Sequence, residues 1–253
     1  MARAQDRPDL TGMWSDPAGL EDFFCLFWCT DVGLERLSAL LDDPANDERP
    51  MMELYAQAAT HQRDHYVLPH LTSVGAQTLG VEPADDPGFL ECIPWAFARQ
   101  VFAPHQLQIE QHGDRVELLY GEWTVRRTIH LGGDAPPPGT PSSPMGYSVG
   151  RYENGVLVVE TTAIAANLAP WGAGFPSGAE IHDGRHSDQL RSVERYTRSD
   201  DGQRLVLSIT LEDPWALAEP LTLKKVWHWA PDQEIAPYDS CERPTEFSRG
   251  VTP

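Results

Sequence analysis

Two patterns of hydrophobic and polar positions divide the chain into a helical part and a strand-rich part. Between residues 19 and 80 the apolar side chains recur every three or four positions, which predicts two or three helices. Pro50 precedes one of these helices and Pro69 follows it, as is typical of a first helical turn and of a helix end. We therefore expect Pro69 to break that helix before His70.

From Phe97 onward the period falls to two, which is typical of half-buried β-strands. Short turn signals separate neighbouring runs, and Asn154-Gly155 is the strongest of them because this pair favours a two-residue hairpin. Two loops rich in glycine and proline, 132–144 and 169–188, interrupt the pattern. The predicted strands are 106–112, 115–122, 123–131, 147–153, 156–164, 189–198, 204–212 and 221–230.

Strands that follow one another without helices between them form an antiparallel meander, and closure into a barrel removes its exposed edges. The sequence therefore predicts a mainly β fold, an antiparallel barrel of about eight strands with an N-terminal helical insertion. We expect one domain over 1–253, with a helical insertion or cap over 19–80 and the β-barrel over 95–242. A barrel of this size either fills its interior with side chains or holds one small ligand.

Charge and composition narrow the classes of partner. The chain has 38 acidic and 19 basic residues, a formal net charge of −19, and such a surface repels nucleic acids and anionic membranes. The longest apolar run, 23–28, is far shorter than the ~20 residues of a membrane span, and no signal peptide is visible. We expect a soluble, cytoplasmic protein whose partner is a small apolar molecule.

The four cysteines are too few and too scattered to predict a disulfide framework. Cys25 and Cys29 are four residues apart, so they fall on one helix face among aromatic residues. Buried packing as free thiols is the favoured interpretation, with a nucleophile or a redox pair as the alternative.

Several segments carry a resemblance to a known family: GRHSDQLRSVERYTR, GYSVGRYENGVLVVETTAI, LTSVGAQ, ITLEDP and PDQEIAPYDSCE. Through them, residues 71–242 resemble a family of largely uncharacterised bacterial lipocalin-like β-barrel proteins. The resemblance implies a lipocalin-like, calycin-type barrel and draws attention to the GRHSD loop, but it implies no particular reaction. That family usually has Gly-x-Pro-His-Ser-Asp in the loop, and here Arg185 stands in place of the proline.

The loop 182–188 concentrates chemically active side chains directly before a predicted strand, so they would lie at the mouth of a barrel. His186 and Asp188 are the leading pair, because a carboxylate beside an imidazole fixes its tautomer and keeps a proton available near neutral pH. In the alternative, Ser187 and Asp188 cap backbone amides and His186 is an exposed turn residue.

A second candidate is the barrel interior. Within one strand Val116, Leu118 and Tyr120 share a face, whereas Arg126, Thr128 and His130 share a face of the next. Inward ionisable groups would be costly unless paired and would mark a functional site, whereas outward ones would only be solvated. The sequence cannot decide, because a slip of one residue exchanges inside for outside.

Metal and cofactor sites are not predicted. His61 and His65 share a helix face, but Gln62 follows where a zinc protease would have glutamate, so a helix-surface pair is the favoured interpretation. The chain has no glycine-rich phosphate loop, no Gly-x-Ser-x-Gly elbow and no dinucleotide fingerprint. We therefore expect no cofactor.

Together these features favour a cofactor-independent lyase or isomerase: a dehydratase, hydratase or isomerase. It would act by proton transfer on a small apolar alcohol or a terpenoid- or polyketide-like molecule. His186 with Asp188 would supply the acid, with Glu122 or Glu194 as inner alternates. The residues expected to bind and orient the substrate are Tyr120, Arg126, His130, Trp123, Trp95 and Trp171.

Two other classes of function stay open. A carrier or sensor barrel would need the pocket and the aromatic side chains but no proton donor. A structural protein would use the N-terminal helices, 19–68, to form a homodimer.

Overall fold

Nine strands form a closed barrel in the order β1-β11-β10-β9-β6-β5-β4-β3-β2, and β7 and β8 form a separate two-stranded sheet. The computed structural model describes residues 7–80, 92–133, 136–171 and 184–236. The mainly β barrel is confirmed, with two differences from the expected architecture. It has nine strands instead of about eight, and β4 and β5 are parallel. Because β4 and β5 are parallel, both begin at the same end of the barrel.

The barrel strands are β1 (Gly12–Ser15), β2 (Leu107–Gln111), β3 (Arg115–Tyr120), β4 (Arg126–Leu131), β5 (Tyr147–Glu153), β6 (Val156–Thr162), β9 (Arg191–Arg198), β10 (Arg204–Glu212) and β11 (Leu221–Trp229). The separate pair is β7 (Asn167–Ala169) and β8 (Gly184–His186). The helices are α1 (Leu20–Phe24), α2 (Asp31–Leu41), α3 (Met51–Gln62), α4 (Leu68–His70), α5 (Ser73–Gln77) and α7 (Phe97–Phe102).

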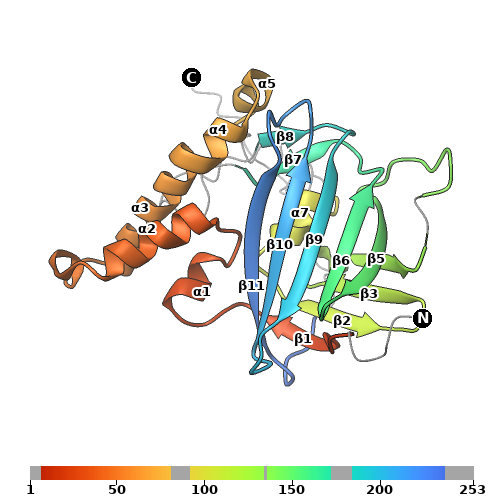
Figure 1. Cartoon of the computed structure of the whole chain (residues 1–253), viewed down its shortest axis with the longest axis horizontal. Coiled ribbons are helices and arrows are strands. Elements are labelled where there is room, and N and C mark those ends of the chain that lie inside the picture. The colour runs from red at the N-terminus through yellow and green to blue at the C-terminus, as the bar shows by residue number, and fades with distance from the viewer. Residues whose placement is uncertain (1–6, 81–91, 134–135, 172–183, 237–253) are drawn as a thin grey trace, which may run out of the picture.

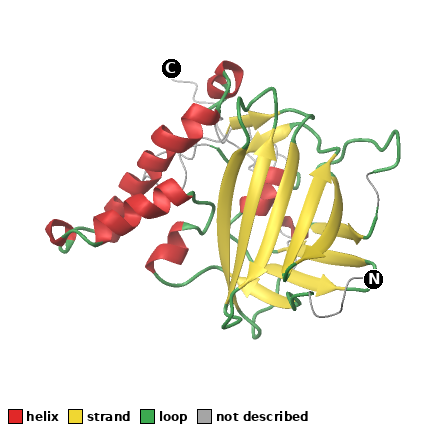
Figure 2. Cartoon of the chain, viewed as in Figure 1, coloured by secondary structure: helices red, strands yellow, loops and turns green. Residues whose placement is uncertain are grey.

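The N-terminal helices lie outside the barrel, along the β11 side (Figures 1 and 2). Leu37 of α2 and Leu54 of α3 belong to one buried cluster that also contains Val226 of β11. Val226 is thus an outward barrel residue covered by helices, and the helical insertion is packed onto the wall of the barrel. Among the described residues no helix is both long and apolar enough to cross a bilayer.

The prediction that Pro69 breaks the helix before His70 is wrong. A π-helix, Arg63–Val67, follows α3 directly, and α4 then carries the helical run through to His70. Leu68 N donates to Arg63 O, the wider spacing of a π-turn. Pro69 lies directly after this wider turn, at the kind of π-bulge where a helix accommodates a proline.

Helix α7 contributes to the core of the barrel. Phe97 and Val101 of α7 are fully buried and belong to the same cluster as the inward residues Leu118 of β3 and Leu207 of β10. In Figure 1 this helix is visible behind β9 and β10. The interior therefore contains a helix as well as strand side chains.

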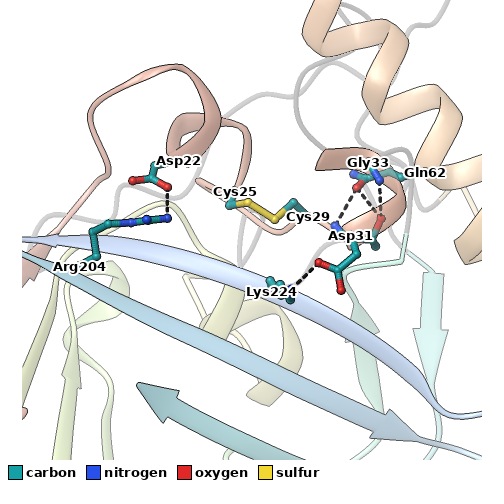
Figure 3. Close-up of a disulfide and its surroundings, with 9 residues drawn as sticks. Asp22, Cys25, Cys29, Asp31, Gly33, Gln62, Arg204 and Lys224 are labelled. Carbon is teal, nitrogen blue, oxygen red and sulfur yellow. Dashed lines mark hydrogen bonds and ion pairs between the residues drawn. A yellow bond between two sulfur atoms is a disulfide. The ribbon is translucent and has the colours of Figure 1, made fainter. Parts of the chain in front are cut away.

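Cys25 and Cys29 form a disulfide that joins the end of α1 to the residues before α2 (Figure 3). Both are buried, as predicted, but the expectation of free thiols is wrong. Cys29 also exchanges two backbone hydrogen bonds of 2.8 Å with Lys224 of β11. Ion pairs of Asp22 with Arg204 and of Asp31 with Lys224 lie on either side of the bond. The disulfide thus holds the start of the helical insertion against the barrel wall.

Candidate functional site

An ion pair between Arg127 of β4 and Glu194 of β9 lies inside the barrel. The guanidinium donates from Nη2 to Oε1 at 2.6 Å and from Nη1 to Oε2 at 2.8 Å. Both side chains are buried, with 2% and 0% of their surface exposed. This is the two-pronged geometry that makes an arginine–carboxylate pair strong.

Neighbouring strands supply the remaining hydrogen-bond partners of Arg127. Its Nε donates to Ser148 Oγ of β5 at 2.9 Å, and Nη2 also donates to Thr161 Oγ1 of β6 at 2.6 Å. The Phe97 ring of α7 covers the guanidinium at 4.8 Å. Tyr120 of β3 completes the set, with its hydroxyl 3.5 Å from Nη1. Every N–H of the guanidinium is therefore directed at a protein group.

Glu194 is surrounded by hydroxyl donors as well. Tyr196 donates to Oε2 at 2.8 Å, while Thr161 and Ser192 donate to Oε1 at 3.1 and 3.2 Å. Burial, followed by the nearby carboxylate, raises the pKa of Tyr196 well above its ordinary value. The donors of Arg127 and the acceptors of Glu194 are thus used by protein groups, and within the described residues this ion pair directs no free guanidinium N–H at a ligand.

Arg126 and His130, which the sequence predicted to bind the substrate inside the barrel, do not point into it. Directly paired residues lie on the same face of a sheet, and the inward residue Leu118 pairs with Arg127. Arg126 is exposed, and the His130 ring stacks on Tyr147 on the outer face with 4.8 Å between ring centroids. Glu122 lies in the short helical turn Glu122–Thr124 between β3 and β4, and its side chain is outside the described part.

The GRHSD loop lines a pocket of about 440 Å³ at one end of the barrel. This end is where β6 and β10 finish and β9 begins, and β7 and β8 lie beside it (Figure 1). His186 is the last residue of β8 and pairs with Asn167 of β7. The pocket is lined by Ala166, Asn167, Arg185, His186, Ser187, Asp188 and Trp215.

The imidazole of His186 is 2% exposed and makes one hydrogen bond, between Nδ1 and Ser187 O at 3.0 Å. A carbonyl oxygen can only accept, so Nδ1 carries the hydrogen and Nε2 has a free lone pair. Nε2 is buried and has no hydrogen-bond partner among the described residues. Burial lowers the pKa of His186, although the Ser187 carbonyl and the charge of Asp213 oppose this. The arrangement is that of a neutral imidazole able to accept a proton.

Asp213 is the residue that the sequence reasoning missed. It is 1% exposed and accepts from the backbone N and the Oγ of Ser187, both at 2.7 Å. It also accepts from Trp215 N at 3.1 Å. One carboxylate thus holds both the residue after His186 and the residue that forms an apolar part of the pocket. A carboxylate placed directly after a predicted strand, in ITLEDP, was the only available signal.

The predicted pairing of His186 with Asp188 is not formed. Asp188 is exposed. The carboxylate whose charge acts on the pKa of His186 is that of Asp213. The turn after β8 explains this, because Ser187 directs its own backbone and hydroxyl to Asp213 while Asp188 follows at the surface. His182 and Asp183, the other members of the predicted loop, lie outside the described residues.

Trp171 packs against β8, next to Gly184 and His186. It is fully buried, and its ring centroid lies 6.5 Å from that of His186. A Cβ at position 184 would lie 2.4 Å from Trp171 Nε1, so only glycine allows this approach. Trp95 and Trp123 form an edge-to-face pair, 6.2 Å between centroids, and neither lines the His186 pocket.

Two groups of side chains that could in principle ligate a metal lie elsewhere in the described part of the chain. Glu110, His112 and Glu117 have ligand atoms within 4.8 Å of one another, but Arg115 already pairs with Glu117 at 2.6 Å. His61 and His65 stack with 4.1 Å between ring centroids on the surface of the helical insertion. Neither group adjoins the His186 pocket.

Comparison with models of known families, with characterised proteins and with solved structures finds no match to this chain. The class of protein is therefore defined by the fold and the pocket. It is a closed, mostly antiparallel β-barrel, an architecture compatible with binding a small ligand.

Proposed function

We propose that the protein binds a small, largely apolar molecule in the His186 pocket and moves a proton on it without a cofactor. The observation that supports this best is the buried Nε2 of His186, a residue that lines the pocket, because this atom has no hydrogen-bond partner among the described residues. An unpaired buried polar atom is costly unless a ligand uses it. The lipocalin-like, calycin-type relationship suggested by the sequence remains part of the same proposal.

In this mechanism Nε2 removes a proton from a carbon next to a carbonyl group. The C–H electron pair forms a C=C bond, and the carbonyl π electrons move to oxygen. The imidazolium, whose charge is favoured by Asp213, then returns the proton to that oxygen or to another carbon. One base completes such an isomerisation, so we favour an isomerase over a dehydratase. Dehydration also needs an acid at the leaving hydroxyl, and Asp188 is exposed.

A carrier or sensor is the alternative function. The inner ion pair of Arg127 and Glu194 favours it, because that network is satisfied by protein groups and gives the barrel no second reacting centre. In a carrier, His186 Nε2 would accept a hydrogen bond from the ligand and no bond would change.

Deuterium exchange separates the two functions. We expect the protein to accelerate incorporation of deuterium from D₂O into the benzylic carbon of methyl phenylpyruvate, measured by NMR. The rate should rise with pH through a pKa below 6.5, the ordinary value for histidine, and then level. His186→Gln should show the buffer rate, because its amide cannot act as a base, whereas His65→Gln should match the unmodified protein. Binding without acceleration would support the carrier, and exchange by His186→Gln would exclude His186 as the base.

The disulfide bears on the location of the protein. Disulfides persist mainly in oxidising compartments and are rare in the cytosol. The Cys25–Cys29 bond therefore favours a location outside the cytoplasm over the cytoplasmic one expected from the sequence.

A further inference from the structure

We infer that the ligand of the His186 pocket carries a carboxylate, bound by Arg185, together with a flat apolar group that packs on Trp215. This inference rests on the proposed function, because it concerns the same pocket. It adds the chemical class of the ligand: an aromatic or similarly planar carboxylic acid with an acidic C–H beside a carbonyl, of which arylpyruvates are the simplest.

Arg185 is the first observation. Arg185 is exposed and lines the pocket, and its guanidinium makes no hydrogen bond or ion pair with any residue in the described ranges. Several arginines elsewhere on the barrel are ion-paired, for example Arg151 with Glu160 at 2.6 Å and Arg191 with Glu212 at 2.9 Å. The planar guanidinium matches a carboxylate with two parallel hydrogen bonds, so its free donors favour that group.

The backbone of Arg185 is fixed although its side chain is not. Its amide donates to Thr78 Oγ1 at 2.9 Å, and it pairs with Leu168 in the β7–β8 sheet. The guanidinium therefore extends from an ordered strand next to His186. Successive side chains of a strand point to opposite faces, and Arg185 is exposed whereas His186 is buried, so a carboxylate held by Arg185 would lie on the exposed side of the pocket.

Asn167 supplies a second donor. Its Oδ1 already accepts from Leu168 N at 2.7 Å, which leaves the amide NH₂ for a ligand oxygen. Ser187 offers no such donor, because its hydroxyl donates to Asp213. Within the described residues, Arg185 and Asn167 thus have unused side-chain donors at the pocket, as does the indole N–H of Trp215, and the buried Nε2 of His186 is an unused acceptor.

Trp215 provides the apolar surface. It is 37% exposed, although large aromatic side chains are mostly covered in this protein, and it lines the same pocket. Its position is fixed by Asp213, which accepts from Trp215 N, and by Thr72, whose Oγ1 donates to Trp215 O at 2.7 Å. An indole held in place at the edge of a pocket suits a flat apolar group.

The negative charge of Asp188 provides a control for the role of Arg185. It lies at the pocket and is exposed, so its charge opposes a bound carboxylate, as does the net charge of −19. Attraction of an acid to this protein must therefore come from local donors, of which Arg185 is the charged one. Removing the two charges should have opposite effects on an acid and little effect on its ester.

Phenylpyruvate and methyl phenylpyruvate form the matched pair of probes, with dissociation constants from tryptophan fluorescence quenching and exchange rates from NMR. The unmodified protein should bind the acid about tenfold more tightly than the ester, the order expected for a charge-assisted hydrogen-bonded pair. Arg185→Gln should abolish this preference, weakening the acid about tenfold and leaving the ester within about twofold. Asp188→Asn should tighten the binding of the acid and leave the affinity for the ester unchanged.

The outcomes distinguish the inference from the function on which it rests. Equal affinity for acid and ester, with exchange on both, would overturn the carboxylate site and keep the proton transfer. Loss of exchange on both probes, with the acid still bound through Arg185, would overturn the proton transfer and keep the carboxylate site. An acid preference that survives in Arg185→Gln would also overturn the assignment of Arg185.

Discussion

Replacement of Glu194 by leucine is expected to lower the free energy of unfolding by about 3–5 kcal/mol. The substitution leaves the guanidinium of Arg127 buried without its counter-charge and without acceptors now at 2.6 and 2.8 Å. Arg127 cannot become neutral by losing a proton, because arginine stays protonated in proteins. Urea unfolding followed by fluorescence measures the change.

Two further variants make this measurement decisive. Arg127→Met combined with Glu194→Leu should recover most of the loss, because apolar side chains of similar volume replace both charges. Glu212→Leu removes the carboxylate of an exposed pair with Arg191 and should change stability by less than about 1 kcal/mol. If Glu194→Leu cost no more than Glu212→Leu, the inner ion pair would not hold the barrel together as described.

Replacement of Lys225 by methionine is expected to raise the free energy of unfolding by about 3 kcal/mol at neutral pH. Lys225 is 1% exposed, and burial lowers its pKa from 10.5 to about 7, with the charge of Asp16 opposing. Its Nζ donates to Ala103 O and lies 4.8 Å from the Trp227 ring, with no ion pair among the described residues. Methionine has a similar shape and carries no charge into the barrel.

The pH dependence identifies the cause. Between pH 7 and about 10.4 the unfolded chain keeps the proton that folded Lys225 has lost, so stability rises with pH by up to ~1.4 kcal/mol per unit. The cost of burial is fully present below the folded pKa of about 7 and disappears above the unfolded one. The advantage of Lys225→Met should therefore shrink from pH 7 to pH 9. A constant advantage across that range would show that packing, not charge, causes it.

The period-two pattern grouped the residues of individual strands by face, but it did not identify the inward face. Leu118 and Tyr120 share a face of β3, and Glu194 and Tyr196 a face of β9, as their spacing indicated, and the structure shows that both faces are inward. For β4 the pattern grouped the residues correctly but could not choose the face. The turn before β4 contains two left-handed residues, Trp123 at φ 58° and Thr124 at φ 51°, so alternation does not continue from β3. Only the pairing of strands reveals that Arg127 faces inward.

The loop before β9 was found from its density of chemical groups, and His186 does line a pocket. Its carboxylate partner could not be found in the same way. Asp213 follows β10, and only the antiparallel pairing of β9 with β10 brings it to Ser187. The spacing of Cys25 and Cys29 likewise suggested one helix face, whereas the chain leaves α1 between them and a bond forms.

The most direct test of the proposed site is the protonation of His186 itself, read from long-range ¹H–¹⁵N correlations of the histidine rings over a pH series. His186→Gln identifies its signals. We expect the neutral form to carry its hydrogen on Nδ1, and the pKa to lie below the ordinary value of 6.5. A hydrogen on Nε2, or a pKa above 6.5, would contradict a free base at the wall of the pocket.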